Sequence, residues 1–215
     1  MEALDWKSKR DLRREGILEI ATEVFCEEGF AATSMSTIAA RMGGSKGTLY
    51  NYFENKDELF EAVVRSRCEE FWRTVFSFVG EDLPVRDLLA RVGEAFLRQH
   101  DERVVRLLRV VIAEAQRAPH LARVFYETGP EAKTRKLAGY LEAAKARGEL
   151  DAPDCLVAAR QFMALCRGGL YLERLLNVTG PGEDARARAE VAGAVELFMT
   201  AYAPGHGDRA HGSAQ

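Results

Sequence analysis

The residues best suited to chemistry form one polar run, SKGTLYN, at positions 45–51. We predict a helix of about eight residues that begins at Ser45, a good capping residue, and that Leu49 anchors to the core. At 1.5 Å per residue this helix is roughly 12 Å long, comparable to the width of a DNA major groove. Its polar groups suit phosphates and base edges, and Gly47 lets the backbone approach a phosphate closely. The side chains expected on this surface are Lys46, Thr48, Tyr50 and Asn51.

A second short helix is expected directly before this run. Ser34 can cap it, and the apolar spacing continues to Met42. Ala39 on its inner face allows a close crossing of two helices, and Gly43 supplies the positive φ that a tight turn needs. With Leu49 anchoring the following helix, this spacing is typical of a helix-turn-helix.

Two further features could bind anions. Asn55 and Glu58 fit a capping box at the start of a long helix, which places Lys56 among free backbone N–H groups at a helix N-terminus. A basic run also precedes the first long helix. It could contact phosphates or the minor groove, or it could be only a solvated helix start. This run contains Lys7, Lys9, Arg10, Arg13 and Arg14.

The charge balance does not by itself indicate a nucleic-acid partner. Residues 1–60 carry 8 Lys and Arg against 11 Asp and Glu, a net charge of −3, and the remainder carries 22 of each. A uniformly basic chain would indicate nucleic-acid binding directly. Any DNA contact must therefore come from the local placement of a few cations.

Catalytic and metal-binding chemistry finds little support elsewhere in the chain. The four histidines form no Glu-x-x-His or His-x3-His pair, and the four cysteines form no Cys-x-x-Cys pair. No nucleophile motif or phosphate-binding loop is present. We therefore expect no enzymatic activity, no metal and no cofactor. Reduced thiols, a charged N-terminus and the lack of an apolar run near 20 residues favour a cytoplasmic protein without a membrane span.

The hydrophobic pattern predicts an all-α fold of about nine helices. From Ile17 onward apolar residues recur at steps of three and four, up to Gly29, which is placed to end the helix. We expect a helix-turn-helix domain at 1–55, a larger helical domain at 56–203 and a disordered tail at 204–215. The later helices are expected at about 56–79, 85–99, 103–117, 120–127, 131–147, 154–176 and 184–203.

The larger domain offers a ligand site and a dimer interface as hypotheses. The helix at 154–176 has two apolar faces, more than one packing surface within the chain needs, so we expect a two-fold homodimer through 154–176 and 184–203. Five residues could line a small-molecule pocket, although each aromatic residue could equally pack the core and Arg109 could extend to the surface. They are Phe71, Phe96, Arg109, Phe162 and Cys166.

Residues 33–59, TSMSTIAARMGGSKGTLYNYFENKDEL, resemble the DNA-binding domain of the TetR/AcrR family of bacterial transcriptional regulators. The segment ILEIATEVFCEEGF at 17–30 resembles the first helix of the same domain. Gly44 departs from the pattern, since the family usually has valine or another apolar residue there. The segments 109–126 and 158–170 more loosely resemble the ligand-binding and dimerisation domain of AefR-like members.

The resemblance implies which residues face DNA. Tyr50 and Lys56 would touch phosphates, and Ser34 and Thr37 would approach the backbone. The remaining contacts would come from Ser45, Lys46, Thr48 and Asn51. It also implies a homodimeric repressor that binds a palindromic double-stranded operator and is released by a small-molecule inducer. The alternatives are an activator with the same DNA surface and a helical small-molecule-binding protein that has lost DNA binding.

Overall fold

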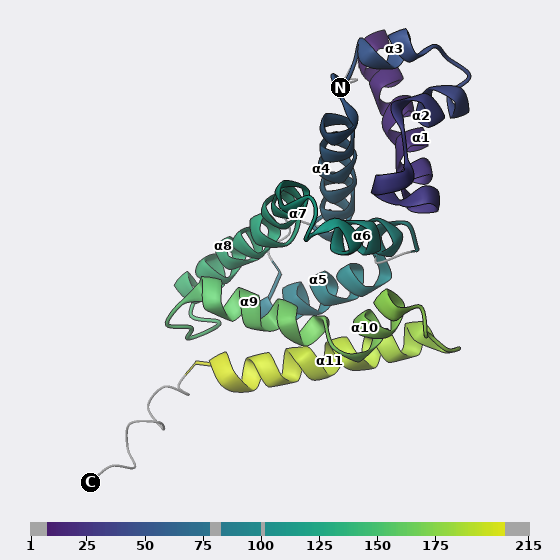
Figure 1. The fold of residues 1–215 in the computed structure, drawn as a ribbon. Coiled ribbons are helices and arrows are strands. Elements are labelled where there is room, and N and C mark those ends of the chain that lie inside the picture. The colour runs from purple at the N-terminus through teal and green to yellow at the C-terminus, as the bar shows by residue number, and fades with distance from the viewer. Residues whose placement is uncertain (1–7, 78–82, 100–101, 205–215) are drawn as a thin grey trace. The chain divides into compact units, whose positions relative to one another are not determined.

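The computed structural model describes residues 8–77, 83–99 and 102–204, and these residues form helices joined by turns (Figure 1). Eleven α-helices and one π-helical turn are present in the described ranges, which confirms the all-α fold class. None of these helices combines the length and apolarity that a bilayer span requires. The expected tail lies outside the described residues from position 205 onward.

The helices pack into two compact units. Unit 1 contains the described residues up to Glu69 together with Arg106–Glu127, and unit 2 contains Glu70–Val105 and the residues from Thr128. The boundary between the two units therefore lies within the long helix Lys56–Val75 and not before that helix. The functional boundary expected at position 55 stays a prediction.

Unit 1 is built around a first helix with a glycine break. The helix begins after Ser8, whose side chain accepts from the Asp11 amide, and Gly29 interrupts it with φ 78° and ψ 164°. A residue with a side chain rarely adopts this conformation, which explains the stop predicted at Gly29. The helices of unit 1 are α1 (Lys9–Ala32), α2 (Met35–Arg41), α3 (Lys46–Tyr50), most of α4 (Lys56–Val75), most of α6 (Glu102–Glu114) and α7 (Pro119–Tyr126).

Aromatic rings form the centre of unit 1. The ring centroid of Phe60 lies 4.9 Å from that of Phe25 and 5.0 Å from that of Phe30, both in edge-on arrangements. Such pairs add stability beyond the area they bury. This cluster fixes the start of α4 against the last turns of α1.

Unit 2 contains the remaining helices. A π-helical turn (Glu127–Glu131) leads into α8 (Ala132–Ala146), and α10 (Gly169–Leu176) begins where the predicted helix at 154–176 is broken. Arg167 and Gly168 are not helical, so the prediction of one helix there is wrong. Two adjacent glycines lower helix propensity, and the Glu190 carboxylate accepts the Leu170 amide at 3.1 Å, which fixes a new helix start. The helices are α5 (Val85–Gln99), α8 (Ala132–Ala146), α9 (Cys155–Cys166), α10 (Gly169–Leu176) and α11 (Glu183–Tyr202).

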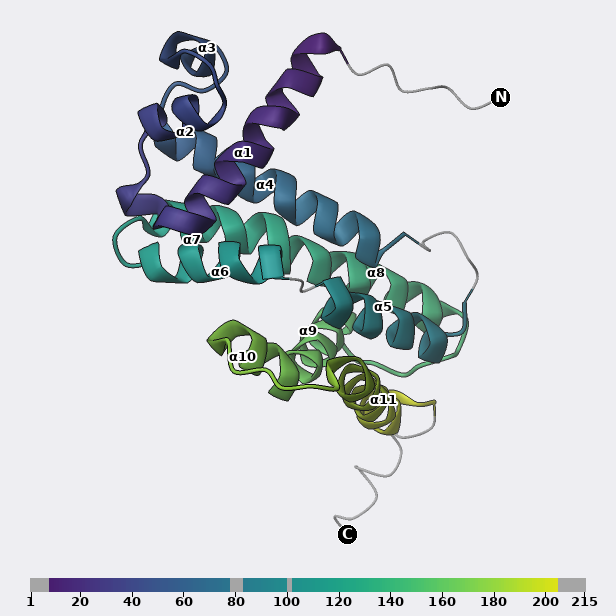
Figure 2. The ribbon, with the colours of Figure 1, turned by 90° about the vertical axis from the view of Figure 1, so that its right-hand side faces the viewer.

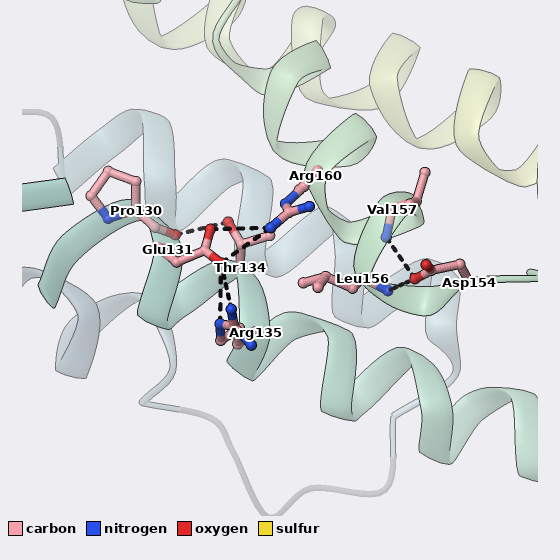
Figure 3. Close-up of polar contacts among 8 residues, drawn as sticks. All are labelled: Pro130, Glu131, Thr134, Arg135, Asp154, Leu156, Val157 and Arg160. Atoms are coloured by element: carbon pink, nitrogen blue, oxygen red, sulfur yellow. Dashed lines mark hydrogen bonds and ion pairs between the residues drawn. The ribbon is translucent and has the colours of Figure 1, made fainter. Parts of the chain in front are cut away.

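Close approaches and a polar cluster hold these helices together. A Cβ atom on Gly93 would lie 2.8 Å from Val191, so glycine allows α5 to pack tightly against α11. Between α8 and α9, the Glu131 carboxylate accepts from Arg135 and Arg160 at 2.9 and 3.1 Å (Figure 3). In a separate contact, the Asp154 side chain caps α9 by accepting the Leu156 amide at 2.8 Å (Figure 3).

Candidate nucleic-acid interface

The predicted polar run forms a short helix that is held down by one leucine. Helix α3 has five residues, fewer than the eight expected, and Leu49 beneath it is fully buried. Ser45 is the N-cap, because its Oγ accepts the Thr48 amide at 3.2 Å. The Thr48 hydroxyl lies 3.1 Å from the same Oγ. The two hydroxyls thus fix the first turn of α3.

The opposite side of α3 faces solvent. Lys46, Gly47 and Asn51 are exposed, Thr48 is partly exposed, and Tyr50 is 50% exposed. A Cβ atom on Gly47 would meet only the Ser45 Oγ, at 3.7 Å. The fold therefore does not require glycine at position 47. An ammonium and a phenol on α3 and an amide at its C-cap are exposed together, as expected from the sequence.

Helix α2 repeats the same capping arrangement. Ser34 is the N-cap, and its Oγ accepts the Thr37 amide at 3.1 Å and lies 2.9 Å from the Thr37 hydroxyl. The predicted positive φ at Gly43 is confirmed at 63°. Gly44 has no positive φ, and a Cβ atom at this position would meet nothing within 4 Å.

Lys56 is turned into unit 1. Its Nζ donates to the carbonyl oxygens of Phe30 at 2.7 Å and Thr33 at 3.0 Å, with Ala31 at 3.4 Å, and lies 4.3 Å from the centroid of the Phe30 ring. An ammonium has three donors, and all three are directed at these carbonyls. Lys56 therefore hydrogen-bonds the carbonyl groups at the end of α1. Its geometry does not support the predicted phosphate contact.

The predicted cap of α4 is present in a modified form. The Asn55 side chain accepts the Glu58 amide at 2.8 Å, as expected for an N-cap. The Glu58 carboxylate, however, accepts the amide of Glu54 at 2.6 Å and not that of Asn55. The return bond of the capping box is thus displaced by one residue.

Cations that remain available near α3 are few. Arg41 at the end of α2 pairs with Glu27 at 2.7 Å, and this hydrogen bond lowers the pKa of the Glu27 carboxyl below its usual value. With Lys56 also engaged, α2 and α3 offer one exposed cation outside an ion pair, Lys46. The exposed surface of α2 and α3 is therefore polar and only weakly basic.

The five predicted pocket residues are divided between the two units, with four of them in unit 2. Phe71 and Phe96 lie together in unit 2, with ring centroids 6.1 Å apart, whereas Phe162 pairs with Phe198 at 5.7 Å. Arg109 belongs to unit 1. The Cys166 thiol lies near the backbone of α5 at Gly93, and burial raises its pKa to about 12.

Sequence reasoning missed an aromatic stack around Phe96. The Trp72 ring lies 5.9 Å from Phe96 at an interplanar angle of 25°, and the Tyr171 ring lies 5.9 Å away at 20°. The Arg167 guanidinium sits 5.8 Å from the centroid of Phe96. Burial raises the pKa of the Tyr171 hydroxyl above its usual value. Tyr171 and Arg167 lie about 70 residues from Phe96 in sequence, so no local pattern could have joined them.

Comparison with known proteins matches both halves of the chain. Residues 17–63 match the family described as "Bacterial regulatory proteins, tetR family". Residues 87–204, more than half of the chain, match "AefR-like transcriptional repressor, C-terminal domain". This family consists of regulators, in agreement with the expectation that the chain is not an enzyme.

Individual relatives agree with these matches. A structure assigned to the TetR family from Mesorhizobium loti MAFF303099 has a TM-score of 0.80 and 26% identity, covering 92% of this chain and all of that one. The "Flavonoid-responsive Regulator FrrA" has a TM-score of 0.74 and 35% identity over 90% of this chain and 98% of its own.

Among curated proteins, the "HTH-type transcriptional activator FasR" of Mycolicibacterium smegmatis (strain ATCC 700084 / mc(2)155) is 36% identical over 101 residues, which is 46% of each chain. The chain thus spans about half the length of the curated relatives that it matches. From the two family matches, the chain belongs to the TetR family of bacterial DNA-binding transcriptional regulators and has an AefR-like C-terminal domain.

Proposed function

We propose that this regulator is a cytoplasmic, homodimeric repressor that binds a palindromic operator and is released by a small-molecule inducer. The observation that carries the proposal is the outward polar face of α3 above the buried Leu49. The matched C-terminal domain is described as that of an AefR-like transcriptional repressor, which supports repression. The activator FasR supports the alternative, because an activator would use the same DNA surface.

The exposed groups of α3 have the chemistry of DNA readout. Lys46 can reach phosphates or guanine, and the Asn51 amide can pair with a base edge. Tyr50 and Thr48 offer hydroxyls to phosphates. Ser34 and Thr37 at the start of α2 would approach the neighbouring backbone. The hydroxyls of Ser34 and Thr37 also form the N-cap contacts of α2, so each would contact DNA while still capping the helix.

A dimer would place two copies of α3 on one face of the duplex. Half-sites would then lie one helical turn, roughly 34 Å, or a multiple of it apart. Large apolar side chains are exposed on the helices expected to form the interface, and this supports the assignment. They are Val157 and Leu165 on α9, Leu172 and Leu176 on α10, and Leu197 on α11.

We propose an inducer with a planar aromatic part, bound against the stack of Trp72, Phe96 and Tyr171. Trp72 and Phe96 are buried, so a further ring would stack on the partly exposed Tyr171, and Arg167 could pair with an anionic oxygen on that ring. The printed name of the flavonoid-responsive relative supports this class. Helix α4 belongs to both units, so a shift of α4 is the proposed route from the ligand to the DNA surface. The size of the effect is limited by the difference in the ligand's affinity for the DNA-binding and the released state.

Gly47→Ala should separate DNA binding from folding. The added methyl group meets only the Ser45 Oγ at 3.7 Å, and alanine favours helix by up to about 1 kcal/mol, so stability should hold or rise. At the proposed phosphate approach the methyl group should lower affinity at least about tenfold, or about 1.4 kcal/mol. Fluorescence anisotropy with the duplex upstream of the protein's own gene measures this.

The matched control is Gly139→Ala, which adds the same methyl group at an exposed helical site with open space. It should leave DNA affinity unchanged. Equal affinities of the parent and both variants would contradict the proposed contact. A parent that binds no duplex at low salt would favour the small-molecule-binding alternative.

Leu197→Glu should weaken the dimer. Leu197 is 62% exposed on α11, and a carboxylate buried at the interface would be unpaired. Sedimentation at micromolar concentration should show a dimeric parent and a largely monomeric variant. Ile112→Glu, at a 53% exposed position of unit 1, is the control and should remain dimeric. A monomeric parent would exclude the proposed interface.

The aromatic stack can be tested with the chain's own fluorescence. Because the chain has two tryptophans, Trp6→Phe leaves Trp72 as the only one. Titration with a flavone should quench its emission saturably, and Tyr171→Ala should raise the dissociation constant at least about tenfold. Tyr202→Ala, in the separate cluster with Phe198, should have no such effect. A lack of quenching, or equal losses in both variants, would refute this ligand class.

A further inference from the structure

The start of α1 carries a concentrated group of cations. At about 100° per residue, the four cations of its first turns fall within an arc of roughly 140°, and the two acidic residues lie on the other side. The cations are Lys9, Arg10, Arg13 and Arg14, and the acidic residues are Asp11 and Glu15. Lys9, Arg10 and Arg13, here called the basic patch, are exposed.

The basic patch surrounds an open hollow beside the end of α3. The hollow has a volume of about 790 Å³ and is lined by the patch together with Leu12 and Tyr52. Tyr52 follows α3 directly, and the Arg10 guanidinium lies 5.8 Å from the centroid of its ring. Figures 1 and 2 both place α3 and the start of α1 at the same end of unit 1.

Whether acidic side chains neutralise the basic patch depends on the ion pairs that its cations form. Within the part of unit 1 that the structure describes, Lys9 and Arg13 form no ion pair. The nearby Asp11 carboxylate accepts from the amide of Ser8 at 3.2 Å and from its hydroxyl at 2.6 Å. Most of the available positive charge next to α3 therefore comes from α1.

We propose that the basic patch is a second DNA-contacting surface, which holds the sugar-phosphate backbone of the strand passing the end of α3. This inference rests on the proposed function. Lys9 and Arg13 lie one turn apart and would neutralise phosphates, while Leu12, which is 57% exposed, and Tyr52 would pack against deoxyribose. The patch thus supplies the phosphate charge that α3, with Lys46 alone, lacks.

The salt dependence of DNA affinity tests this surface. The double variant Lys9→Gln/Arg13→Gln keeps helix-forming residues at exposed positions and leaves the stacked Arg10 and Arg14 intact. Each lost phosphate contact reduces the slope of log K against log salt by about 0.9, so a dimer losing four contacts should show a slope shallower by about 3 to 4. The probe is the duplex upstream of the protein's own gene.

The control is Arg65→Gln/Arg117→Gln, which removes equal charge from exposed positions of unit 1 outside the patch and should leave the slope unchanged. A parent that binds the duplex while the patch variant keeps its slope and affinity overturns this inference alone. A parent that binds no duplex overturns the proposed function as well. Patch-dependent binding to phosphatidylglycerol vesicles with an unchanged DNA slope would assign the patch to a lipid surface and refute the proposal.

Discussion

Burial of Leu49 is the interaction on which the DNA-binding surface depends. Helix α3 has five residues, far fewer than an isolated helix needs to persist in water. Complete burial of a leucine contributes about 1.5 to 3 kcal/mol, and a serine cap such as Ser45 about 1 kcal/mol. These two contributions fix the helix with its polar side outward. The proposed roles of Lys46, Tyr50 and Asn51 all assume that this orientation is held before DNA arrives.

The placement of charge matters more here than its sum. Residues 1–60 carry a net charge of −3, yet the structure engages two cations in contacts within the protein and gathers others at the start of α1. Arg41 pairs with Glu27, and Lys56 closes the end of α1. The first turns of α1 and Lys46 then remain to attract phosphates. An acidic domain can in this way present a locally basic surface beside its recognition helix.

Features with local causes could be predicted from the sequence, and those with tertiary causes could not. The caps at Ser34 and Ser45, the break at Gly29 and the turn at Gly43 depend on residues at most four positions apart, and all four are found. The inward turn of Lys56 depends on carbonyls 23 to 26 residues away, which no spacing rule reveals. The grouping of Trp72, Phe96 and Tyr171 likewise requires three helices to meet, and the break at Gly168 depends on Glu190 of another helix.

Replacement of Leu49 tests the central claim most directly. Leu49→Ala should leave most helix content and the oligomeric state intact, while the affinity for the upstream duplex falls at least about 100-fold, or about 2.7 kcal/mol. Leu137→Ala, at an equally buried leucine of α8, is the matched control and should lower the melting temperature without comparable loss of affinity. Binding of the Leu49→Ala protein as tightly as the parent would contradict the account.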